Sequence, residues 1–403
     1  MVVRSRPPGR QAVNVRRANQ KATDVLVVGA GAIGLACAWR AAQRGLSVRV
    51  IDRETPGAGA SRVAAGMLAP VGEASWGEET LLELNLASAR AYPAFAAELE
   101  QDSGSRVGYR RCGALHVALD RDEVDELRRR HELQRSLGLE AEWLPPGSCR
   151  ELEPGLSPRI AGGVHVPDEG EVDPRTLVAA LVAATERAGG EIVAGAEAVR
   201  PLIDGDRLRG VGTADGAELR AERVVLATGC WSGTASWLPP EARPAVRPIK
   251  GQILMLRGPS ADPVCERIVG TEWVYVVPRD DGRVVLGATV EERGFELTVT
   301  AGGVHELLRE AYRVLPEVAE LELIEAVAGL RPGTPDNAPL IGPGALDGLI
   351  LATGHFRNGI LLAPVTAESV AALIAGKDPP HDLAPFSPLR FSARPAASAA
   401  EVR

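Results

Sequence analysis

The sequence lacks any run of eighteen apolar residues, and it lacks a Cys-x-x-Cys pair. Without such a run, no membrane-spanning helix is predicted. Five cysteines are scattered along the chain: Cys37, Cys112, Cys149, Cys230 and Cys265. This spacing indicates neither a disulfide framework nor a zinc site, and it is typical of a protein in a reducing compartment. We therefore predict a cytoplasmic protein with no membrane partner and no metal.

Acidic residues are absent from the first 21 positions, which carry six basic residues. The rest of the chain therefore has a formal net charge of −14, against −8 for the whole. An acidic body disfavours nucleic acid as a partner. The basic head also lacks the apolar core of a secretory signal, so we expect residues 1–22 to be a disordered head, with a transit peptide as the alternative. We expect residues 385–403 to be a loose tail.

A chain of 403 residues is longer than those that fold around a single hydrophobic core, so its length predicts two or three domains. A hydrophobic content of 45% is typical of a globular protein. The chain should therefore fold into more than one packed unit.

The segment from Asp24 to Asp52 reads DVLVVGAGAIGLACAWRAAQRGLSVRVID. Its apolar pattern predicts a buried strand, a helix and a second strand, at Val25–Val28, Leu35–Arg44 and Val48–Ile51. A GxGxxG motif lies between the first strand and the helix. Strand, motif, helix, strand and terminal acid together indicate a dinucleotide-binding unit. A Gly-rich turn that binds no nucleotide is the alternative.

The residues of this unit have separate tasks. Gly29 is expected to make the tight turn, Gly31 to let backbone N–H groups approach a pyrophosphate, and Gly34 to let the helix pack on the strand. Asp52 stands where a carboxylate can accept hydrogen bonds from ribose hydroxyls, which argues against a 2′-phosphate on the cofactor. The adjacent Arg53 weakens that argument. From these residues alone, both FAD and NAD fit.

Further elements follow from periodicity and turn chemistry. Helices are predicted at Leu81–Glu100 and Glu123–Leu137, with a strand at 110–119 between them, and Asp173 is expected to cap a helix that begins at Pro174. Strands are predicted at Ile192–Val199, Arg207–Thr213, Glu218–Leu219 and Val224–Ala227. The stretch Ile249–Val290 is typical of an antiparallel sheet, with a hairpin turn at 280–282. A further strand is expected at Leu323–Ala328 and a helix at Ile360–Ala375, with Pro364 in or near its first turn.

Four later segments carry a family resemblance. They read ASRVAAGML (60–68), VVLATGCWS (224–232), GLRPGTPDNAPLIG (329–342) and ATGHFRNGILLAP (352–364). With the GxGxxG unit, they resemble the D-amino-acid oxidase and sarcosine oxidase family of FAD enzymes, and within it the glycine oxidases of the thiamine-biosynthesis type. The resemblance runs from Asp24 to about Lys377 and favours FAD over NAD.

The resemblance implies an α/β and α+β fold. A Rossmann-like FAD-binding domain of the glutathione-reductase type would be formed by 24–95, 165–245 and 325–380, and an inserted antiparallel-sheet substrate domain by 96–164 and 246–324. No cysteine follows Cys265 near the arginine segment, so noncovalent FAD is expected. Related glycine oxidases form tetramers, so the resemblance also implies a homo-oligomer.

Two residues are implied to be catalytic. Arg331 stands at a strand end, where a guanidinium can hold a carboxylate with two parallel hydrogen bonds, and it matches the arginine that binds the substrate carboxylate in the family. The alternative for Arg331 is a salt bridge to Asp336 or to another acid. Tyr275 matches a tyrosine that lines the family's pocket, with core packing as the alternative. Trp273, two residues earlier, stands where a relative has histidine, so the pocket wall should depart from the family pattern.

The remaining site residues also follow from the resemblance. Substrate binding is assigned to Arg331, Tyr275, Arg357 and Met67. His355 could act as a general base, but a structural role is favoured. The implied cofactor contacts are Gly29, Gly31, Ala32, Ile33, Gly34, Asp52, Arg53, Ser61, Ala65, Gly66, Met67, Thr228, Gly229, Gly354, His355, Arg357, Asn358, Gly359 and Ile360.

The implied activity is oxidative deamination of glycine or a small amine such as sarcosine or a small D-amino acid. Hydride would pass from the α-carbon to flavin N5, the imine would hydrolyse to glyoxylate and ammonia, and molecular oxygen would become hydrogen peroxide. The alternatives are a D-amino-acid or sarcosine dehydrogenase with another electron acceptor, and a noncatalytic flavoprotein or subunit. A nicotinamide-dependent dehydrogenase is disfavoured because the segment GHFRNGI would have no task there.

Overall fold

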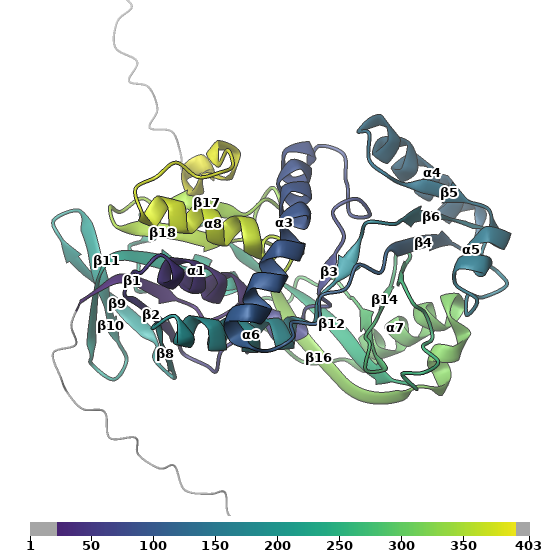
Figure 1. Ribbon diagram of the computed structural model, residues 1–403, viewed down its shortest axis with the longest axis horizontal. Helices are drawn as coiled ribbons and strands as arrows, with labels where there is room; N and C mark the ends of the chain where they lie inside the picture. The colour runs from purple at the N-terminus through teal and green to yellow at the C-terminus, as the bar shows by residue number, and fades with distance from the viewer. Residues whose placement is uncertain (1–21, 392–403) are drawn as a thin grey trace, which may run out of the picture.

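Two eight-stranded sheets organise the computed structural model, which describes residues 22–391. In Figure 1 the first sheet lies at the left and the second at the right. The predicted basic head lies outside the described residues except for Ala22. Within 22–391, no helix combines the length and hydropathy needed to cross a membrane.

The first sheet has a mainly parallel centre with the order β17-β18-β11-β1-β2-β8. Strand β17 is antiparallel to β18, and β9 and β10 extend β11 as an antiparallel ribbon. Because β1 lies between β11 and β2, the strand order reverses there, and ligands bind at such a point in open α/β sheets. The strands are β1 (Thr23–Val28), β2 (Val48–Asp52), β8 (Glu191–Ala194), β9 (Ala198–Asp204), β10 (Arg207–Thr213), β11 (Glu218–Leu226), β17 (Leu340–Pro343) and β18 (Leu349–Thr353).

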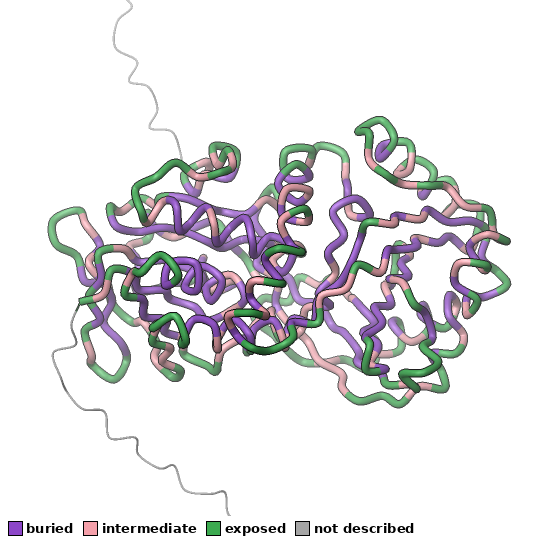
Figure 2. The backbone as a smooth tube through the Cα atoms, viewed as in Figure 1, coloured by how far each residue is buried: buried purple, intermediate pink, exposed green. Residues whose placement is uncertain are grey.

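Four helices cover one face of this sheet and share one core with it. Helix α1 contacts α6 and α8, and α3 contacts α6 and α8 as well. Figure 2 shows buried backbone through both sheets and through the helices packed on the first one. Ala and Leu on α1 let it lie close to β1, and Trp39 is fully buried there. The helices are α1 (Ala32–Gln43), α3 (Glu79–Ser103), α6 (Pro174–Arg187) and α8 (Ala363–Ile374).

The second sheet is mainly antiparallel, with the order β16-β12-β15-β14-β13-β4-β6-β5. Only the β13–β4 pair within this sheet is parallel. The strands are β4 (Ala114–Ala118), β5 (Glu142–Leu144), β6 (Gly162–Val166), β12 (Arg247–Arg257), β13 (Ile268–Gly270), β14 (Tyr275–Pro278), β15 (Arg283–Gly287) and β16 (Glu322–Gly333). Three helices accompany it: α4 (Arg121–Ser136), α5 (Pro146–Leu152) and α7 (Ala301–Val314). The predicted fold class, including the hairpin at 280–282, is confirmed.

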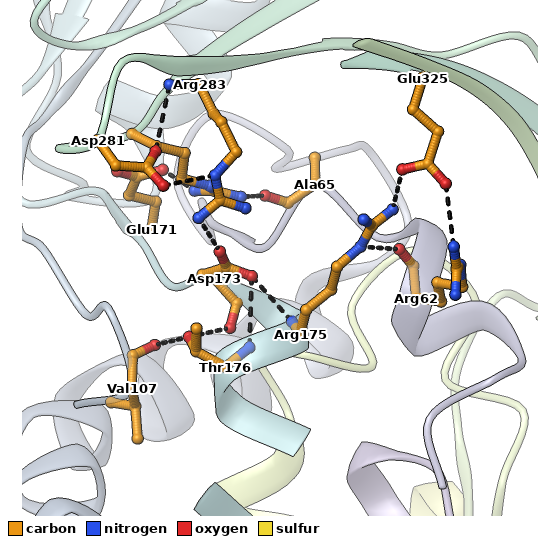
Figure 3. Close-up of polar contacts among 11 residues, drawn as sticks. Arg62, Ala65, Val107, Glu171, Asp173, Arg175, Thr176, Asp281, Arg283 and Glu325 are labelled. Atoms are coloured by element: carbon orange, nitrogen blue, oxygen red, sulfur yellow. Dashed lines mark hydrogen bonds and ion pairs between the residues drawn. The ribbon is translucent and has the colours of Figure 1, made fainter. Parts of the chain in front are cut away.

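Polar side chains join the two sheets at the start of α6 (Figure 3). The Asp173 carboxylate accepts hydrogen bonds from two N–H groups of the first turn of α6 and from Arg283 of β15, at 2.6 Å for Arg283. Glu325 of β16 pairs with Arg175 at 2.6 Å and with Arg62 at 3.1 Å. Arg62 belongs to the short helix α2 (Ala60–Val63), which is followed by the two-stranded pair β3 (Met67–Leu68) and β7 (Gly170–Glu171). The segment 60–68 is therefore fixed from the side of the second sheet.

Three details differ from the sequence predictions. The strand expected at Ile192–Val199 is divided into β8 and β9 because Gly195 has a φ of 75°, which ends extended structure. The strands expected at Glu218–Leu219 and Val224–Ala227 form one strand, β11, whose first part pairs with β10 and whose second part pairs with β1. Strand β16, divided by the predicted domain boundary at 325, pairs with β12 in the second sheet up to Gly333.

The end of the chain requires another correction. Residues 385–391, which we predicted to begin a loose tail, pack against the protein. Phe386 is buried, and Arg390 forms an ion pair with Asp336 at 2.8 Å. Burial of an aromatic ring and a two-pronged ion pair fix this segment. The rest of the predicted tail, 392–403, lies outside the described residues.

Candidate active site

A cavity of about 580 Å³ extends from the carboxyl ends of β1 and β11 to the second sheet. At one end it is lined by the turn after β1 and by Asp52. At the other end it is lined by Gly251 of β12, Tyr275 of β14 and Arg331 of β16. One continuous space therefore connects the nucleotide-binding motif to an arginine and a tyrosine.

The turn after β1 is built on close backbone approach. Gly29 has a φ of 113°, and a Cβ there would lie 2.4 Å from the carbonyl oxygen of Ala227. A Cβ on Gly34 would lie 1.9 Å from the carbonyl oxygen of Gly29. A Cβ on Gly31 would meet only the Ser61 hydroxyl, at 3.4 Å. Gly29 and Gly34 therefore allow the turn and the helix packing, while Gly31 leaves space on the cavity side.

Asp52 and Arg53 mark the far end of the cavity. The Asp52 carboxylate accepts hydrogen bonds from the backbone N–H groups of Ala30 (2.8 Å) and Glu54 (2.9 Å). These bonds hold it at the end of β2 beside the glycine turn. The Arg53 guanidinium lies over the ring of Trp231 at 4.5 Å, and Trp231 also lines the cavity. The arrangement offers a carboxylate for hydroxyl groups and a flat aromatic wall.

Most of the predicted cofactor contacts line this one cavity. The residues that do so are Gly29, Gly31, Ala32, Ile33, Asp52, Arg53, Ser61, Ala65, Gly66, Met67, Thr228, Gly229, His355, Arg357, Gly359 and Ile360. Gly34, Gly354 and Asn358 do not line it. Gly34 packs against the turn, a Cβ on Gly354 would lie 2.6 Å from Thr334, and Asn358 lines a small neighbouring cavity instead.

These residues fit an FAD molecule. The N-terminus of α1 faces the cavity at Gly31 and Ala32, where N–H groups and the helix dipole favour phosphate. A Cβ on Gly31 or Gly59 would meet a single side chain, at 3.4 Å, so the backbone there is open toward the cavity. A Cβ on Gly66 would instead strike the carbonyl oxygen of Val172 at 1.9 Å, so glycine at that position permits close packing. The cavity then continues past this phosphate-binding position to the second sheet, which gives room for a group that extends well beyond a pyrophosphate.

A family comparison agrees with this geometry. Residues 24–373 match the model of the DAO family, described as FAD dependent oxidoreductase. The chain belongs to this family. The match includes both the nucleotide end and the arginine end of the cavity.

Several relatives match the chain over most of its length. A glycine oxidase from Geobacillus kaustophilus is 36% identical over 371 residues, covering 90% of this chain and 96% of the relative. A crystal structure of glycine oxidase from that organism matches with a TM-score of 0.85 and 35% identity, covering 92% and 99% of the two chains. The bifunctional protein ThiO/ThiG of Trichormus variabilis is 36% identical, and the match covers 91% of this chain but 55% of that longer protein. The hydrogen cyanide synthase subunit HcnC of Pseudomonas aeruginosa is 30% identical, covering 93% and 98%.

The position of Arg331 in this DAO-family chain depends on glycine in the neighbouring strand. A Cβ on Gly251 of β12 would lie 2.3 Å from Nη1 of Arg331, so the guanidinium lies over a bare backbone. Arg331 Nη1 donates to the carbonyl oxygen of Thr289 at 3.1 Å, and no carboxylate among residues 22–391 forms an ion pair with it. Asp336 pairs with Arg390 instead, so the alternative prediction, a salt bridge of Arg331, is not supported among residues 22–391. Arg331 therefore faces the cavity with donors available for an anion.

Tyr275 also lies over a glycine of the neighbouring strand, and it lines the same cavity as Arg331. It is opposite Gly287 in the β14–β15 pair, where a Cβ would lie 2.3 Å from the tyrosine hydroxyl. Burial raises the pKa of Tyr275, and the positive charge of Arg331 opposes that rise. The hydroxyl is therefore a neutral hydrogen-bond donor at neutral pH. Trp273 precedes β14, is half exposed, and is not among the residues lining the cavity, so the expected change in the pocket wall does not occur there.

His355 lines the cavity but is held by the protein. Its Nε2 hydrogen-bonds with the Thr366 hydroxyl at 3.0 Å. Burial lowers the pKa of His355 to about 3, so its imidazole is neutral at neutral pH. This arrangement supports the structural role over the general base.

The sequence interpretation missed three residues. Gly251 and Gly287 provide the space for the arginine and the tyrosine, and only the register of the second sheet shows this. Glu73 lines the cavity, and its charge interacts with the charges of Arg331 and Arg357. It follows the segment GMLAP, but a single acid in a loop carries no sequence signal, because most such acids are solvated.

Proposed function

We propose that this chain is an FAD-dependent oxidase of glycine and other small primary or secondary amines. Glycine, water and dioxygen would give glyoxylate, ammonia and hydrogen peroxide. The observation that carries the proposal is the single cavity that connects the nucleotide turn to Arg331 and Tyr275. The similarity to glycine oxidases over nine-tenths of the chain supports this substrate class.

The residues of the chain would bind and orient the substrate. Arg331 is free to hold the carboxylate with two parallel hydrogen bonds, and the Tyr275 hydroxyl can donate a third. Met67 and Arg357 also line the cavity and would complete its walls. Positioning of this kind can supply a large part of the barrier reduction. FAD, when bound, supplies the hydride acceptor and passes the electrons to oxygen.

We further propose that the FAD is bound noncovalently. No cysteine of residues 22–391 is among those that line the cavity, and Cys230, which is adjacent to Trp231 in the chain, is buried. Acid precipitation should therefore release the yellow colour into the supernatant. Colour that stays with the pellet contradicts a noncovalent cofactor.

An anaerobic substrate panel tests the activity itself. Glycine, sarcosine and small D-amino acids are added to the purified yellow protein, and bleaching of the flavin absorbance is recorded. Readmission of air should restore the colour and produce peroxide. Arg331→Ala should keep FAD but raise the apparent substrate constant steeply, because the carboxylate loses its charged partner. If no amine bleaches the flavin, the proposed function is wrong.

A second candidate is an amine dehydrogenase or a subunit of one. This candidate is supported by the 30% identity to HcnC, which is described as a subunit of hydrogen cyanide synthase. Bleaching by glycine without peroxide under air would identify it. We also propose a cytoplasmic homo-oligomer with the two domains predicted from the sequence, to be tested by sizing of the purified protein and by limited proteolysis.

A further inference from the structure

Glu73 is an acid in the candidate active site that has no partner of its own. It lines the large cavity and also a small adjoining one. Its carboxylate forms no hydrogen bond and no ion pair with any residue in the range 22–391. Tyr275, Arg331 and Arg357 line the same large cavity. An acid in this position could complete its hydrogen bonds only with water or with a ligand.

The backbone that carries Glu73 is held from both sides by buried side chains. Glu169 accepts hydrogen bonds from the N–H groups of Val71 (3.0 Å) and Gly72 (2.5 Å), and Gln134 donates to the carbonyl oxygen of Val71 at 3.0 Å. Both Glu169 and Gln134 are 1% exposed. The protein therefore fixes the position of the loop instead of leaving the acid mobile.

Gly72 lets this support come close. A Cβ there would lie 2.2 Å from Nε2 of His116 and 3.0 Å from the carboxylate of Glu169. The loop is thus pressed against strand β4, which carries His116, and the next residue, Glu73, is directed to the cavity. A site held by packed and hydrogen-bonded neighbours in this way is preorganised for a ligand.

Charged groups of both signs surround Glu73. Arg357 and Arg331 are positive, Glu169 is negative, and His116 is the titratable group on the β4 side. Burial is the largest effect and raises the pKa of Glu73 above its ordinary value, while Arg357 opposes this rise. Tyr275 also feels the charge of Glu73. The acid therefore ionises at a higher pH than a solvated glutamate, and a positive group placed beside it would favour its carboxylate form.

We propose that Glu73 binds the ammonium group of the amino-acid substrate while Arg331 binds its carboxylate. The ammonium group then releases one proton to water before hydride leaves the α-carbon, because only the neutral amine has the lone pair that assists this step. This inference rests on the proposed function. A zwitterion presents opposite charges at its two ends, and the cavity presents an acid and an arginine that have no ionic partners among the described residues. A hydroxy acid of the same size would satisfy Arg331 but leave Glu73 facing a neutral hydroxyl. Glu73 would then be the residue that selects amines over hydroxy acids.

The test compares glycine with glycolate in the FAD-loaded protein. Glu73→Gln keeps the shape but removes the charge, so the KM for glycine should rise about tenfold while kcat changes little. The Kd of glycolate, measured by the shift of the flavin spectrum, should stay the same or fall, because a negative charge near a bound anion is removed. Glu73→Asp should recover part of the glycine affinity. Glu83→Gln, on an exposed acid of α3, is the matched control and should behave as wild type.

A pH profile gives an independent measurement. In the wild type, the KM for glycine should rise as the pH falls through the raised pKa of Glu73, because the carboxylate gains a proton and loses its charge. In Glu73→Gln this limb should be absent. A merely structural residue would move glycine and glycolate binding together.

The outcomes separate this inference from the proposed function. If the wild type oxidises glycine but Glu73→Gln keeps the wild-type KM, the ammonium role is wrong and the oxidase remains. Equal weakening of glycine and glycolate would also overturn the role, since only the amine should feel the loss. If the wild type is inert toward glycine, the proposed function itself fails. Unchanged FAD content in Glu73→Gln shows that the variant is folded.

Discussion

The two ends of the cavity both depend on glycine, but the glycines face different neighbours. At the nucleotide end, a Cβ on Gly29 or Gly34 would strike a backbone carbonyl oxygen at 2.4 or 1.9 Å. At the substrate end, a Cβ on Gly251 or Gly287 would strike the tip of Arg331 or Tyr275, at 2.3 Å in each case. Backbone in a packed turn cannot move away, whereas a side-chain tip can. The same substitution should therefore damage folding at one end and substrate binding at the other.

Gly34→Ala should have the largest effect and should break the nucleotide end. The added methyl group requires α1 to move away from the turn after β1, which we expect to destabilise the protein by at least about 3 kcal/mol and to abolish FAD binding. Flavin absorbance and urea denaturation measure both effects. Gly147→Ala is the control, because Gly147 is exposed in helix α5 and a Cβ there meets nothing within 4 Å. A yellow, stable Gly34→Ala protein would contradict this account of the turn.

Gly251→Ala should sharpen the contrast at the substrate end. The methyl group would push the guanidinium of Arg331 out of place while the nucleotide end stays intact. We expect normal FAD content and a KM for glycine that is raised about 10- to 100-fold. Steady-state kinetics and the flavin spectrum of one preparation show both. If FAD is lost with the substrate affinity, the two ends are not separable.

The sequence could predict the nucleotide end because its parts are neighbours in the chain. Gly29, Gly31, Gly34 and Asp52 lie within one strand–helix–strand unit. The close contacts of Gly29 and Gly34 agree with the predicted turn and helix packing, whereas the roles of Gly31 and Asp52 toward a cofactor stay predictions. The parallel strands and the antiparallel second sheet also followed from local patterns. Local backbone chemistry decides such features, so a single segment carries the information.

The substrate end could be predicted only in part. Arg331 and Tyr275 came from a family resemblance, and the cavity contains both. The space they need comes from Gly251 and Gly287, which face them only because β12 pairs with β16 and β14 pairs with β15 in a particular register. A shift by one residue would exchange the faces of a strand. Strands β12, β14 and β15 are buried on both faces, so their continuous apolar runs do not specify the register. Glu73 was missed because a single acid in a loop carries no sequence signal, and the side chains that support its loop, Glu169 and Gln134, lie far along the chain.

Asp173→Ala should weaken the polar contact between helix α6 on the first sheet and strand β15 of the second sheet. Its carboxylate caps α6 and also holds Arg283 of the second sheet, and the side chain is buried (Figure 3). Loss of both functions should lower the free energy of unfolding by about 2 to 3 kcal/mol. Asp120→Ala provides the comparison, because Asp120 caps α4 at 3.0 Å with no partner across the sheets, and about 1 kcal/mol or less is expected. Equal losses in denaturation experiments would mean that the Arg283 contact adds nothing.

The smallest effect compares two adjacent glycines at the start of α7. A Cβ on Gly302 meets nothing within 4 Å, whereas a Cβ on Gly303 would lie 2.5 Å from the amide nitrogen of Gln252. Gly302→Ala should raise the free energy of unfolding by about 0.5 kcal/mol, because alanine loses less backbone freedom than glycine in a helix. Gly303→Ala should cancel that gain, since it disturbs the hydrogen bond from Gln252 to Glu291, now 2.7 Å long. Thermal melts of the two variants measure the difference, and equal melting temperatures would show that the Gln252 side chain yields without loss. In that event, the Gln252 side chain would move away from an added methyl group, as we expect of the side-chain tips at the substrate end of the cavity. The backbone at the nucleotide end could not move in this way.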